Sequence, residues 1–292
     1  MTEIKSDDAQ GSTLIVPSQR TIFFISDRTA ITAITLGQSL LTQFDHIDFE
    51  EITLPFIDTV AKAKSLVTEI SNAAKEKGER PIVFSTLVDP HLRHIIKCSN
   101  CLFLDFFETF ISSLETEFST SSSRAVGRYH RLDDKRGTYD ARIDAVNFAI
   151  NNDDGIATKN YEKADVILTG VSRTGKTPTC LYLALQFGIY AANYPMTEEN
   201  VNAESLKLPQ PLRSYRKKIF GLNVNPERLH VIRSQRRPNS SYASIDQCRR
   251  EVTLAKNVFT REKIPNLNVT SMSVEEIAST IIVNRKLKRR HL

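Results

Sequence analysis

The chain has 292 residues, of which 40% are hydrophobic and 25% are charged, a composition typical of soluble globular proteins with one large or two modest domains. The formal net charge is only +5, and no arginine-and-aromatic pattern or DNA-reading module is visible, so we expect no nucleic-acid partner. The longest apolar runs fall far short of the ~20 residues of a membrane-spanning helix, and residues 1–19 lack the features of a signal peptide, which predicts a cytoplasmic protein with no membrane partner.

In the first part of the chain, apolar runs alternate with segments of helical periodicity. We expect strands at residues 21–26, 49–54, 81–85 and 101–105, and helices at residues 30–44 and 59–77, the second closed by Gly78. Residues 118–139 are rich in serine and charge and predict a long loop, which would serve as a domain crossover or a functional lid. A helix at 141–150 and a strong turn at 151–155 follow.

A second series of alternating elements begins at Ala164. We expect strands at residues 166–169, 189–194, 219–224 and 267–269, and helices at residues 178–187, 226–235, 244–262 and 273–286. The last helix starts with the capping-box pair Ser273 and Glu276. Strands that alternate with helices predict an α/β architecture in which the sheets are mostly parallel.

Four cysteines include the pair Cys98 and Cys101, whose C-x-x-C spacing is compatible with zinc or redox chemistry. A structural zinc site needs about four ligands, and no second Cys or His pair stands at a suitable spacing. Cys101 also opens an apolar run, where cysteine serves as a small hydrophobic residue. We therefore favour a packing role for this pair.

A phosphate-binding loop carries the clearest chemistry in the sequence. It matches the pattern G-x-x-x-x-G-K-[ST] and lies between an apolar strand and a helix, as such loops require. Its glycines let successive backbone N–H groups face one centre, and the helix N-terminus adds partial positive charge. Lys176 would reach the terminal phosphates, Thr177 would bind Mg²⁺ through its hydroxyl, and Arg173 would add a bidentate cation. The expected nucleotide-binding residues are Gly170, Val171, Ser172, Arg173, Thr174, Gly175, Lys176 and Thr177.

These patterns predict an N-terminal α/β domain and a C-terminal P-loop, kinase-like α/β domain. We place a disordered tail at 1–18, the N-terminal domain at 19–118, a linking loop and helix at 119–163, the P-loop phosphotransferase domain at 164–284 and a basic tail at 285–292.

Phosphoryl transfer needs further charged groups, for which the sequence offers several candidates. The segment 226–237 carries four arginines and fits either a lid over the transferring group or a solvated basic helix. A metal-side carboxylate is expected at a strand end, and Asp105 is favoured over Asp27 and Asp89 because four apolar residues precede it. The acceptor-orienting base would be His130, Asp134 or Asp144. For each acid a capping or solvated role stays open.

Several segments of the chain are similar to the regulatory proteins of phosphoenolpyruvate synthase and of pyruvate, phosphate dikinase. The similarity rests on residues 23–33, 81–90, 104–108, 170–195 and 237–244, and it spans about residues 20–282. The intact Gly175-Lys176 pair and the sequence of residues 186–195 resemble the phosphoenolpyruvate synthase branch more closely than the pyruvate, phosphate dikinase branch. Matches this long and dispersed are specific.

The resemblance implies a bifunctional enzyme that regulates another enzyme. Such proteins inactivate the dikinase by phosphorylating a threonine with ADP as the donor. They reactivate it by phosphorolysis, which consumes inorganic phosphate and releases pyrophosphate. The expected ligands are ADP, inorganic phosphate and Mg²⁺, the expected partner is phosphoenolpyruvate synthase, and Lys176, Arg173 and Asp105 are the expected catalytic residues. Two alternatives stay open, an ATP-dependent small-molecule kinase and a non-catalytic ADP-sensing module.

The chain departs from the family pattern at two positions. Ile34 stands where an acidic residue is usual, and Arg28 replaces a common glycine. The departure at Ile34 would matter if that acid takes part in catalysis, whereas a variable position in the first helix would be harmless. The sequence does not fix the oligomeric state, although a protein that acts on a large partner often forms a homodimer.

Overall fold

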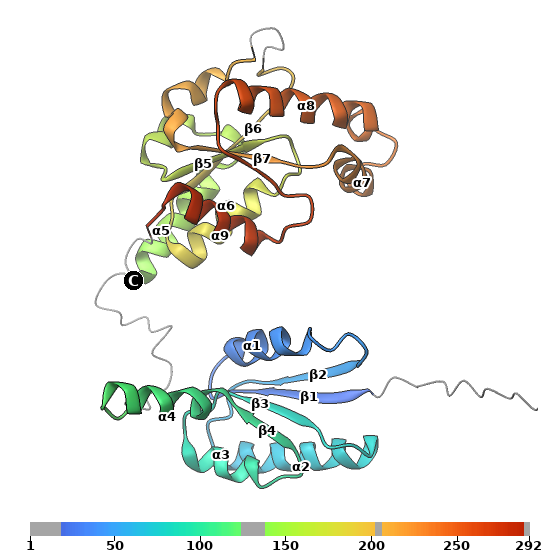
Figure 1. Cartoon of the computed structure of the whole chain (residues 1–292), viewed down its shortest axis with the longest axis vertical. Helices are drawn as coiled ribbons and strands as arrows, with labels where there is room; N and C mark the ends of the chain where they lie inside the picture. The colour runs from blue at the N-terminus through green and yellow to red at the C-terminus, as the bar shows by residue number, and fades with distance from the viewer. Residues whose placement is uncertain (1–18, 124–137, 202–205, 289–292) are drawn as a thin grey trace, which may run out of the picture. The chain divides into compact units, whose positions relative to one another are not determined.

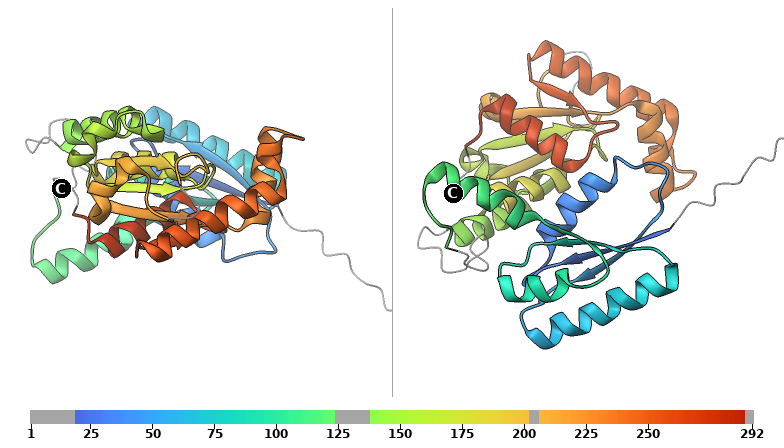
Figure 2. Two further views of the ribbon diagram at one scale, coloured as in Figure 1. Left: turned by 90° about the horizontal axis from the view of Figure 1, so that it is seen from above. Right: turned by 60° about the horizontal axis from the view of Figure 1, so that its bottom comes forward.

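The computed structural model describes residues 19–123, 138–201 and 206–288. The chain divides into two compact units, Met1–Arg131 and Leu132–Leu292. Each unit holds one four-stranded sheet whose strand pairs are all parallel, with helices on both faces (Figures 1 and 2). The predicted α/β architecture with parallel sheets is therefore confirmed. No helix of the described ranges is long and apolar enough to cross a membrane.

Unit 1 is built around a central apolar strand. Its elements are β1 (Arg20–Ile25), α1 (Ile31–Leu41), β2 (Phe49–Leu54), α2 (Val60–Lys77), β3 (Ile82–Ser85), α3 (Pro90–Lys97), β4 (Leu102–Asp105) and α4 (Phe106–Phe118). The strands lie in the order β2-β1-β3-β4. Because side chains alternate along β1, Phe23 and Ile25 pack with α2 and α3, while Ile22 and Phe24 pack with α1 on the opposite face. Each such buried side chain stabilises the fold by about 1.5–3 kcal/mol.

Helices α3 and α4 were not predicted from the sequence, although each has a capping signal. Asp89 accepts hydrogen bonds from the backbone N–H groups of His91 (2.7 Å) and Leu92 (3.4 Å), and Pro90 occupies the first turn of α3. Asp105 caps α4 through the N–H of Glu108 at 2.8 Å. Asp105 is the last residue of β4, and only residues 86–89 separate β3 from α3, so the connections between strand and helix are too short to show as separate patterns.

Unit 2 repeats the α/β alternation around the second sheet. Its helices are α5 (Thr138–Asn151), α6 (Lys176–Phe187), α7 (Pro226–Arg236), α8 (Ile245–Arg261) and α9 (Val274–Arg285), and its strands are β5 (Val166–Gly170), β6 (Ala191–Pro195), β7 (Ile219–Asn223) and β8 (Asn266–Asn268). Short 3-10 helices lie at Asp153–Gly155, Thr158–Lys163, Gln210–Lys218 and Ser241–Ala243. The strand order is β6-β5-β7-β8.

Two apolar clusters cover the faces of this sheet. Val166 and Leu168 of β5 pack with α5, α6 and α9, whereas Ile167 points to the face covered by α8 (Figure 1). Ala145 and Ala149 bring α5, assigned from the sequence to a linking segment, into the first of these clusters. The predicted capping box is present, because Ser273 N–H donates to Glu276 and Glu276 N–H donates to the Ser273 hydroxyl.

The two departures from the family pattern lie at and near the start of α1. Ile34 packs against the apolar cluster beneath α1, so this position has a packing role in the chain. Arg28 is exposed in the loop between β1 and α1. The predicted loop at 118–139, with His130 and Asp134, lies mostly outside the described residues.

Candidate phosphate-binding site

The predicted phosphate loop begins at the carboxyl end of β5, a fully buried strand, and ends at the N-terminus of α6. Gly170 has φ +154°, and a Cβ there would lie 2.3 Å from the backbone oxygen of Leu222 on the neighbouring strand β7. No other residue fits this position, because the obstacle is backbone rather than a movable side chain. The loop therefore leaves the sheet in contact with β7.

The backbone conformation of the loop suits the binding of an anion. Arg173 (φ +77°) and Gly175 (φ +79°) both adopt left-handed conformations, the alternation that turns successive N–H groups toward one point. The Thr174 hydroxyl donates to the Val171 oxygen at 3.0 Å and closes the turn. Helix α6 has no side-chain cap at Gly175 and no acid in its first turn, so its N-terminal amides and partial positive charge suit an anion.

Lys176 is buried inside this loop with only 5% of its surface exposed. Its Nζ donates to the backbone oxygens of Gly170 (3.1 Å) and Val171 (3.0 Å). Burial lowers the pKa of this lysine from 10.5 to about 8, and the nearby charges of Asp154 and Asp153 oppose that decrease. The predicted phosphate-binding cation is thus at the centre of the loop, held by the carbonyls that precede it.

A carboxylate that sequence reasoning missed lies on Thr177. The Thr177 hydroxyl donates to Asp153 Oδ1 at 2.8 Å, and Asn193 Nδ2 donates to the same oxygen. Asn193 is buried in the middle of β6 and its Oδ1 accepts from the N–H of Asp154 at 3.1 Å, so its amide holds both acids in place. Asp154 adopts a left-handed conformation with φ +46°.

The sequence interpretation treated this segment as a turn only. The adjacent acids Asp153-Asp154, placed before the phosphate-loop strand, are the signal that could have found the carboxylate. The sequence alone does not show that these acids lie close to Thr177, because their position depends on how α5 and β6 pack.

The pair of Asp153 and Thr177 has the donor set that Mg²⁺ uses in nucleotide sites. That cation is bound there through one or two carboxylates and a hydroxyl, together with phosphate oxygens and water. No cluster of three or more His, Cys, Asp or Glu side chains arranged for a metal occurs in the described part of the chain. A protein-only metal cage is therefore not formed by those residues, whereas a cation shared with a bound phosphate fits them.

The other predicted carboxylates have local partners. Asp105 caps α4 and lies 3.4 Å from Arg93, and Asp89 caps α3. Asp27 accepts from the N–H of Val88 at 3.1 Å, and its partial burial raises the pKa of its carboxyl group. These three residues belong to unit 1, and Asp144 is exposed on α5 of unit 2. A catalytic role for Asp105 stays a prediction.

The arginine-rich segment forms helix α7, and its arginines differ in environment. Arg228, Arg236 and Arg237 are exposed, which leaves them available to a lid or to solvent. Arg233 is completely buried and pairs with Glu251 at 2.6 Å. Its guanidinium also contacts the phosphate loop, so for this residue neither a mobile lid nor a solvated face describes the structure.

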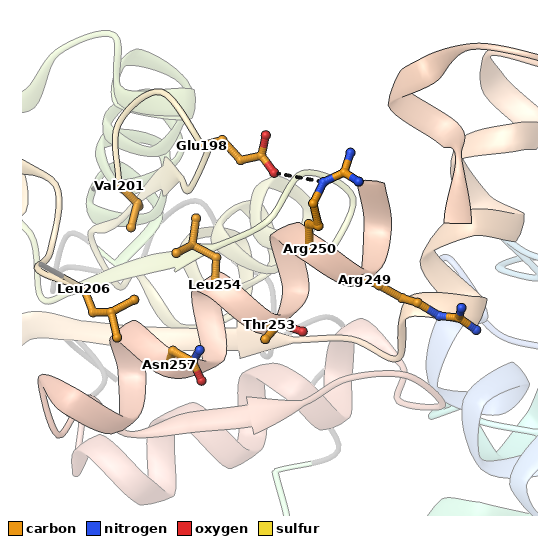
Figure 3. A pocket seen from close by; sticks show the side chains of 8 residues that line it. All are labelled: Glu198, Val201, Leu206, Arg249, Arg250, Thr253, Leu254 and Asn257. Carbon is orange, nitrogen blue, oxygen red and sulfur yellow. Dashed lines mark ion pairs between the residues drawn. The ribbon is translucent and has the colours of Figure 1, made fainter. Parts of the chain in front are cut away.

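A cavity of about 750 Å³ lies elsewhere on unit 2, along α8 (Figure 3). It is lined by Glu198, Val201, Leu206, Arg249, Arg250, Thr253, Leu254 and Asn257. Arg250 spans it to reach Glu198 at 3.7 Å, the ion pair drawn in Figure 3. The cavity shares no residue with the phosphate loop or with Asp153, so it is a separate feature of the unit.

The sequence profile of the kinase/pyrophosphorylase family matches residues 22–282. The chain belongs to this family. A protein of Alkalilimnicola ehrlichii is 53% identical over 94% of the chain and 98% of its own length. Proteins of Pseudomonas fluorescens (52%, covering 93% of the chain and 99% of their own length) and Pseudomonas aeruginosa (53%, covering 93% and 98%) are similarly close. All three carry the provisional name phosphoenolpyruvate synthase regulatory protein.

Membership places the phosphate loop in a family described by phosphoryl chemistry. The family match covers both units, from β1 to α9, and so includes the loop, Asp153 and Arg233. The resemblance inferred from dispersed sequence segments is thereby confirmed at the level of the family.

Proposed function

We propose that the protein is an ADP-dependent protein-threonine kinase and a phosphate-dependent phosphorylase that regulates phosphoenolpyruvate synthase. The observation that carries the proposal is the phosphate loop closed around the buried Lys176, with the carboxylate of Asp153 on Thr177, in a chain of the kinase/pyrophosphorylase family. The names of the relatives support phosphoenolpyruvate synthase as the partner.

In the forward direction the loop would hold the β-phosphate of ADP. Amide groups at the start of α6, with Lys176 and Arg173, would neutralise the charge on its oxygens. A threonine oxygen of the partner would attack the β-phosphorus, the bond to the bridging oxygen would break, and AMP would leave. The threonine proton would pass to a base, and Mg²⁺ held by Asp153 and Thr177 would offset charge on the phosphates.

In the reverse direction the same loop would hold inorganic phosphate. One of its oxygens would attack the phosphorus of phosphothreonine, which forms pyrophosphate and returns the threonine oxygen with a proton. This reaction brings two anions together, so strong positive charge is required. Lys176, Arg173 and the N-terminus of α6 supply it within unit 2.

Two residues complete the proposed machinery. Asp153 is the metal-side carboxylate, because its oxygen contacts the Thr177 hydroxyl. Asp105, the residue favoured from the sequence, is kept as a proposed catalytic acid whose replacement by asparagine would lower transfer without weakening the binding of ADP. The predicted cytoplasmic location and homodimer belong to this proposal as well.

The test uses the full chain, purified phosphoenolpyruvate synthase, Mg²⁺ and either ADP labelled at the β-phosphate or ATP labelled at the γ-phosphate. We expect labelled phosphothreonine on the partner from ADP, and pyrophosphate on later addition of inorganic phosphate. Labelling from ATP alone would contradict the proposal in favour of an ATP-dependent kinase. Binding of ADP with no transfer would favour the sensing module.

A matched pair of variants links the activity to the site. Asp153→Asn removes the carboxylate on Thr177, whereas Asp246→Asn removes an exposed acid in the first turn of α8. We expect transfer to fall by at least tenfold in the first and to change by less than about twofold in the second. Equal losses in the two variants would show that the activity does not depend on the site.

A further inference from the structure

One buried arginine joins three segments behind the phosphate loop. Arg233 of α7 is 0% exposed, and its Nη2 pairs with Glu251 of α8 at 2.6 Å. Its Nη1 donates to the backbone oxygen of Tyr242 at 3.0 Å, and the guanidinium lies 4.1 Å from the centre of the Tyr242 ring. The charge is therefore compensated and the plane of the guanidinium is fixed by stacking.

The same arginine and tyrosine both contact Ser172 of the loop. Arg233 Nη2 donates to the Ser172 backbone oxygen at 3.3 Å, and the Tyr242 hydroxyl donates to Ser172 Oγ at 2.9 Å. Ser172 is thus held at its carbonyl and at its side chain by residues about 60 to 70 positions later in the chain. Neither contact involves Lys176 or Thr177, the residues expected to bind the phosphate and Mg²⁺.

The contact with the Ser172 oxygen also sets the direction of the next amide. In a planar trans peptide the C=O and the N–H point in opposite directions. Because Arg233 holds the Ser172 oxygen, the Arg173 N–H points away from the guanidinium. Arg173 has φ +77°, a strained conformation for a residue with a side chain, and it persists only where the surroundings impose it.

Only arginine can make this set of contacts at once. The planar guanidinium has five donors and reaches Glu251, Tyr242 and Ser172 simultaneously, whereas a lysine ammonium is a single flexible point charge. The arrangement is internal to the unit and needs no motion of α7.

We propose that Arg233 and Tyr242 are positioning residues that fix the Ser172–Arg173 peptide so that its N–H binds the phosphate of a nucleoside diphosphate. The inference rests on the proposed function only in requiring that the loop bind a phosphate chain. Neither residue touches the reacting atoms, and both act through Ser172.

The test compares Arg233→Lys and Tyr242→Phe with a control, Arg249→Lys. The lysine keeps a positive charge beside Glu251, and the phenylalanine keeps the ring beneath Arg233 and loses only the hydroxyl. Arg249 is an exposed arginine of α8 that pairs with Glu227 at 3.1 Å and has no contact with the loop among its described partners. The probes are ADP and inorganic pyrophosphate, with Kd measured by calorimetry and KM and kcat by threonine labelling.

We expect Arg233→Lys to raise KM for ADP and Kd for both probes about tenfold, and Tyr242→Phe to raise them about threefold, as hydrogen bonds of these two kinds do. The value of kcat should change by less than about twofold, because the amide binds phosphate in the ground state and the transition state alike. Arg249→Lys should leave all of these values within about twofold.

A purely structural role would give a different pattern. It would lower the melting temperature and the fraction of active protein, and hence the apparent kcat, while KM and Kd of the folded fraction stayed at the wild-type values. That result would overturn the inference. A wild-type protein that binds both probes but transfers no phosphate would remove the proposed function and leave the Kd comparison valid, whereas one that binds neither probe would overturn both.

Discussion

The two units share one strand order and differ in the loop that follows the first strand. In both sheets the first strand lies second, with the next strand on one side and the two later strands on the other, as β2-β1-β3-β4 and β6-β5-β7-β8. The connections therefore reverse direction between β1 and β3, and between β5 and β7. Parallel α/β sheets bind ligands at the carboxyl edge beside such a reversal.

In unit 1, the polar groups of the loop at this edge are hydrogen-bonded within the unit. Ser26 Oγ accepts from the N–H of Arg28 at 3.1 Å, and the carboxylate of Asp27 accepts from Val88 at 3.1 Å. The segment Ser26–Ala30 has no glycine, and its charged residues are Asp27 and Arg28. At the position where α6 begins with Lys176, α1 begins with Ile31. The same strand order thus occurs in both units, and the residues of the loop decide which unit suits an anion.

The strongest test of this difference between the units removes one basic residue from each loop, Lys176 in unit 2 and Arg28 in unit 1. Lys176→Ala should weaken ADP binding and transfer in both directions by at least about 100-fold, because the phosphate loses its buried counter-charge. Arg28→Ala should change ADP binding by less than about twofold. Calorimetry with ADP checks both variants, and a large loss in Arg28→Ala would mean that unit 1 also contributes to the nucleotide site.

The carboxylates of the two loops allow a second, smaller contrast. Asp153→Asn should raise the Mg²⁺ concentration needed for half-maximal activity by about tenfold or more, since one charged ligand is lost. Asp27→Asn should leave the Mg²⁺ dependence unchanged, because Asp27 contacts backbone of its own unit. Titration of activity with Mg²⁺ is the measurement, and a shift in the Asp27 variant alone would reverse the assignment.

The burial of Lys176 should also make the stability of the protein depend on pH. Below pH 8 both folded and unfolded chains carry a protonated Lys176, and the folded chain bears the unfavourable burial of that charge. Between pH 8 and 10.5 only the unfolded chain keeps the proton, so the free energy of unfolding should rise with pH, by about 3 kcal/mol at most.

Denaturant unfolding of the wild type and of Lys176→Met at pH 7 and pH 9.5 isolates this contribution, because other titrations cancel in the difference. Between these pH values, we expect the free energy of unfolding of the wild type to rise by about 2 kcal/mol relative to that of the variant. The affinity for ADP should fall by about tenfold for each pH unit above 8, since the bound phosphate needs the lysine protonated. If the difference in the free energy of unfolding between the two proteins did not change with pH, the result would contradict the inferred burial of the Lys176 charge.

The smallest expected effect concerns backbone strain in unit 1. Ala30 has φ +63° at the start of α1, a conformation that glycine adopts without strain. Ala30→Gly should stabilise the protein by about 0.5–1 kcal/mol, after the greater flexibility of the unfolded chain is allowed for. In contrast, Ala74→Gly inside α2 should destabilise it by about 1 kcal/mol. Thermal unfolding of the two variants, with opposite signs, tests the interpretation.

The sequence was sufficient where a pattern is local. Alternating apolar segments predicted the strands of both sheets to within about two residues. The pattern G-x-x-x-x-G-K-[ST] identified the candidate phosphate loop, because its eight residues are consecutive in the sequence. The repeated strand order was not visible, since it depends on which strands pair and no internal sequence repeat accompanies it.

Residues that act through distant partners could not be found in this way. Asp153 meets Thr177 only after α5 and β6 pack, and Arg233 meets Ser172 across 61 positions. In a linear pattern both look like ordinary turn or helix residues. Asp105 shows that a local pattern can also be ambiguous. An acid at the end of a strand fits a metal ligand as well as it fits the helix cap that the structure shows.

Gly170 has a consequence for how relatives of this protein change over time. Its hydrogen atom faces the Leu222 carbonyl, so any side chain there would push β5 and β7 apart, whether or not the loop ever holds a phosphate. Selection for a folded unit alone would preserve this glycine in a descendant that had lost its activity. A relative that keeps Gly170 but has replaced Lys176 would therefore have kept the glycine for the packing of its sheet alone. Lys176 is thus a better marker than Gly170 of a relative that still binds phosphate.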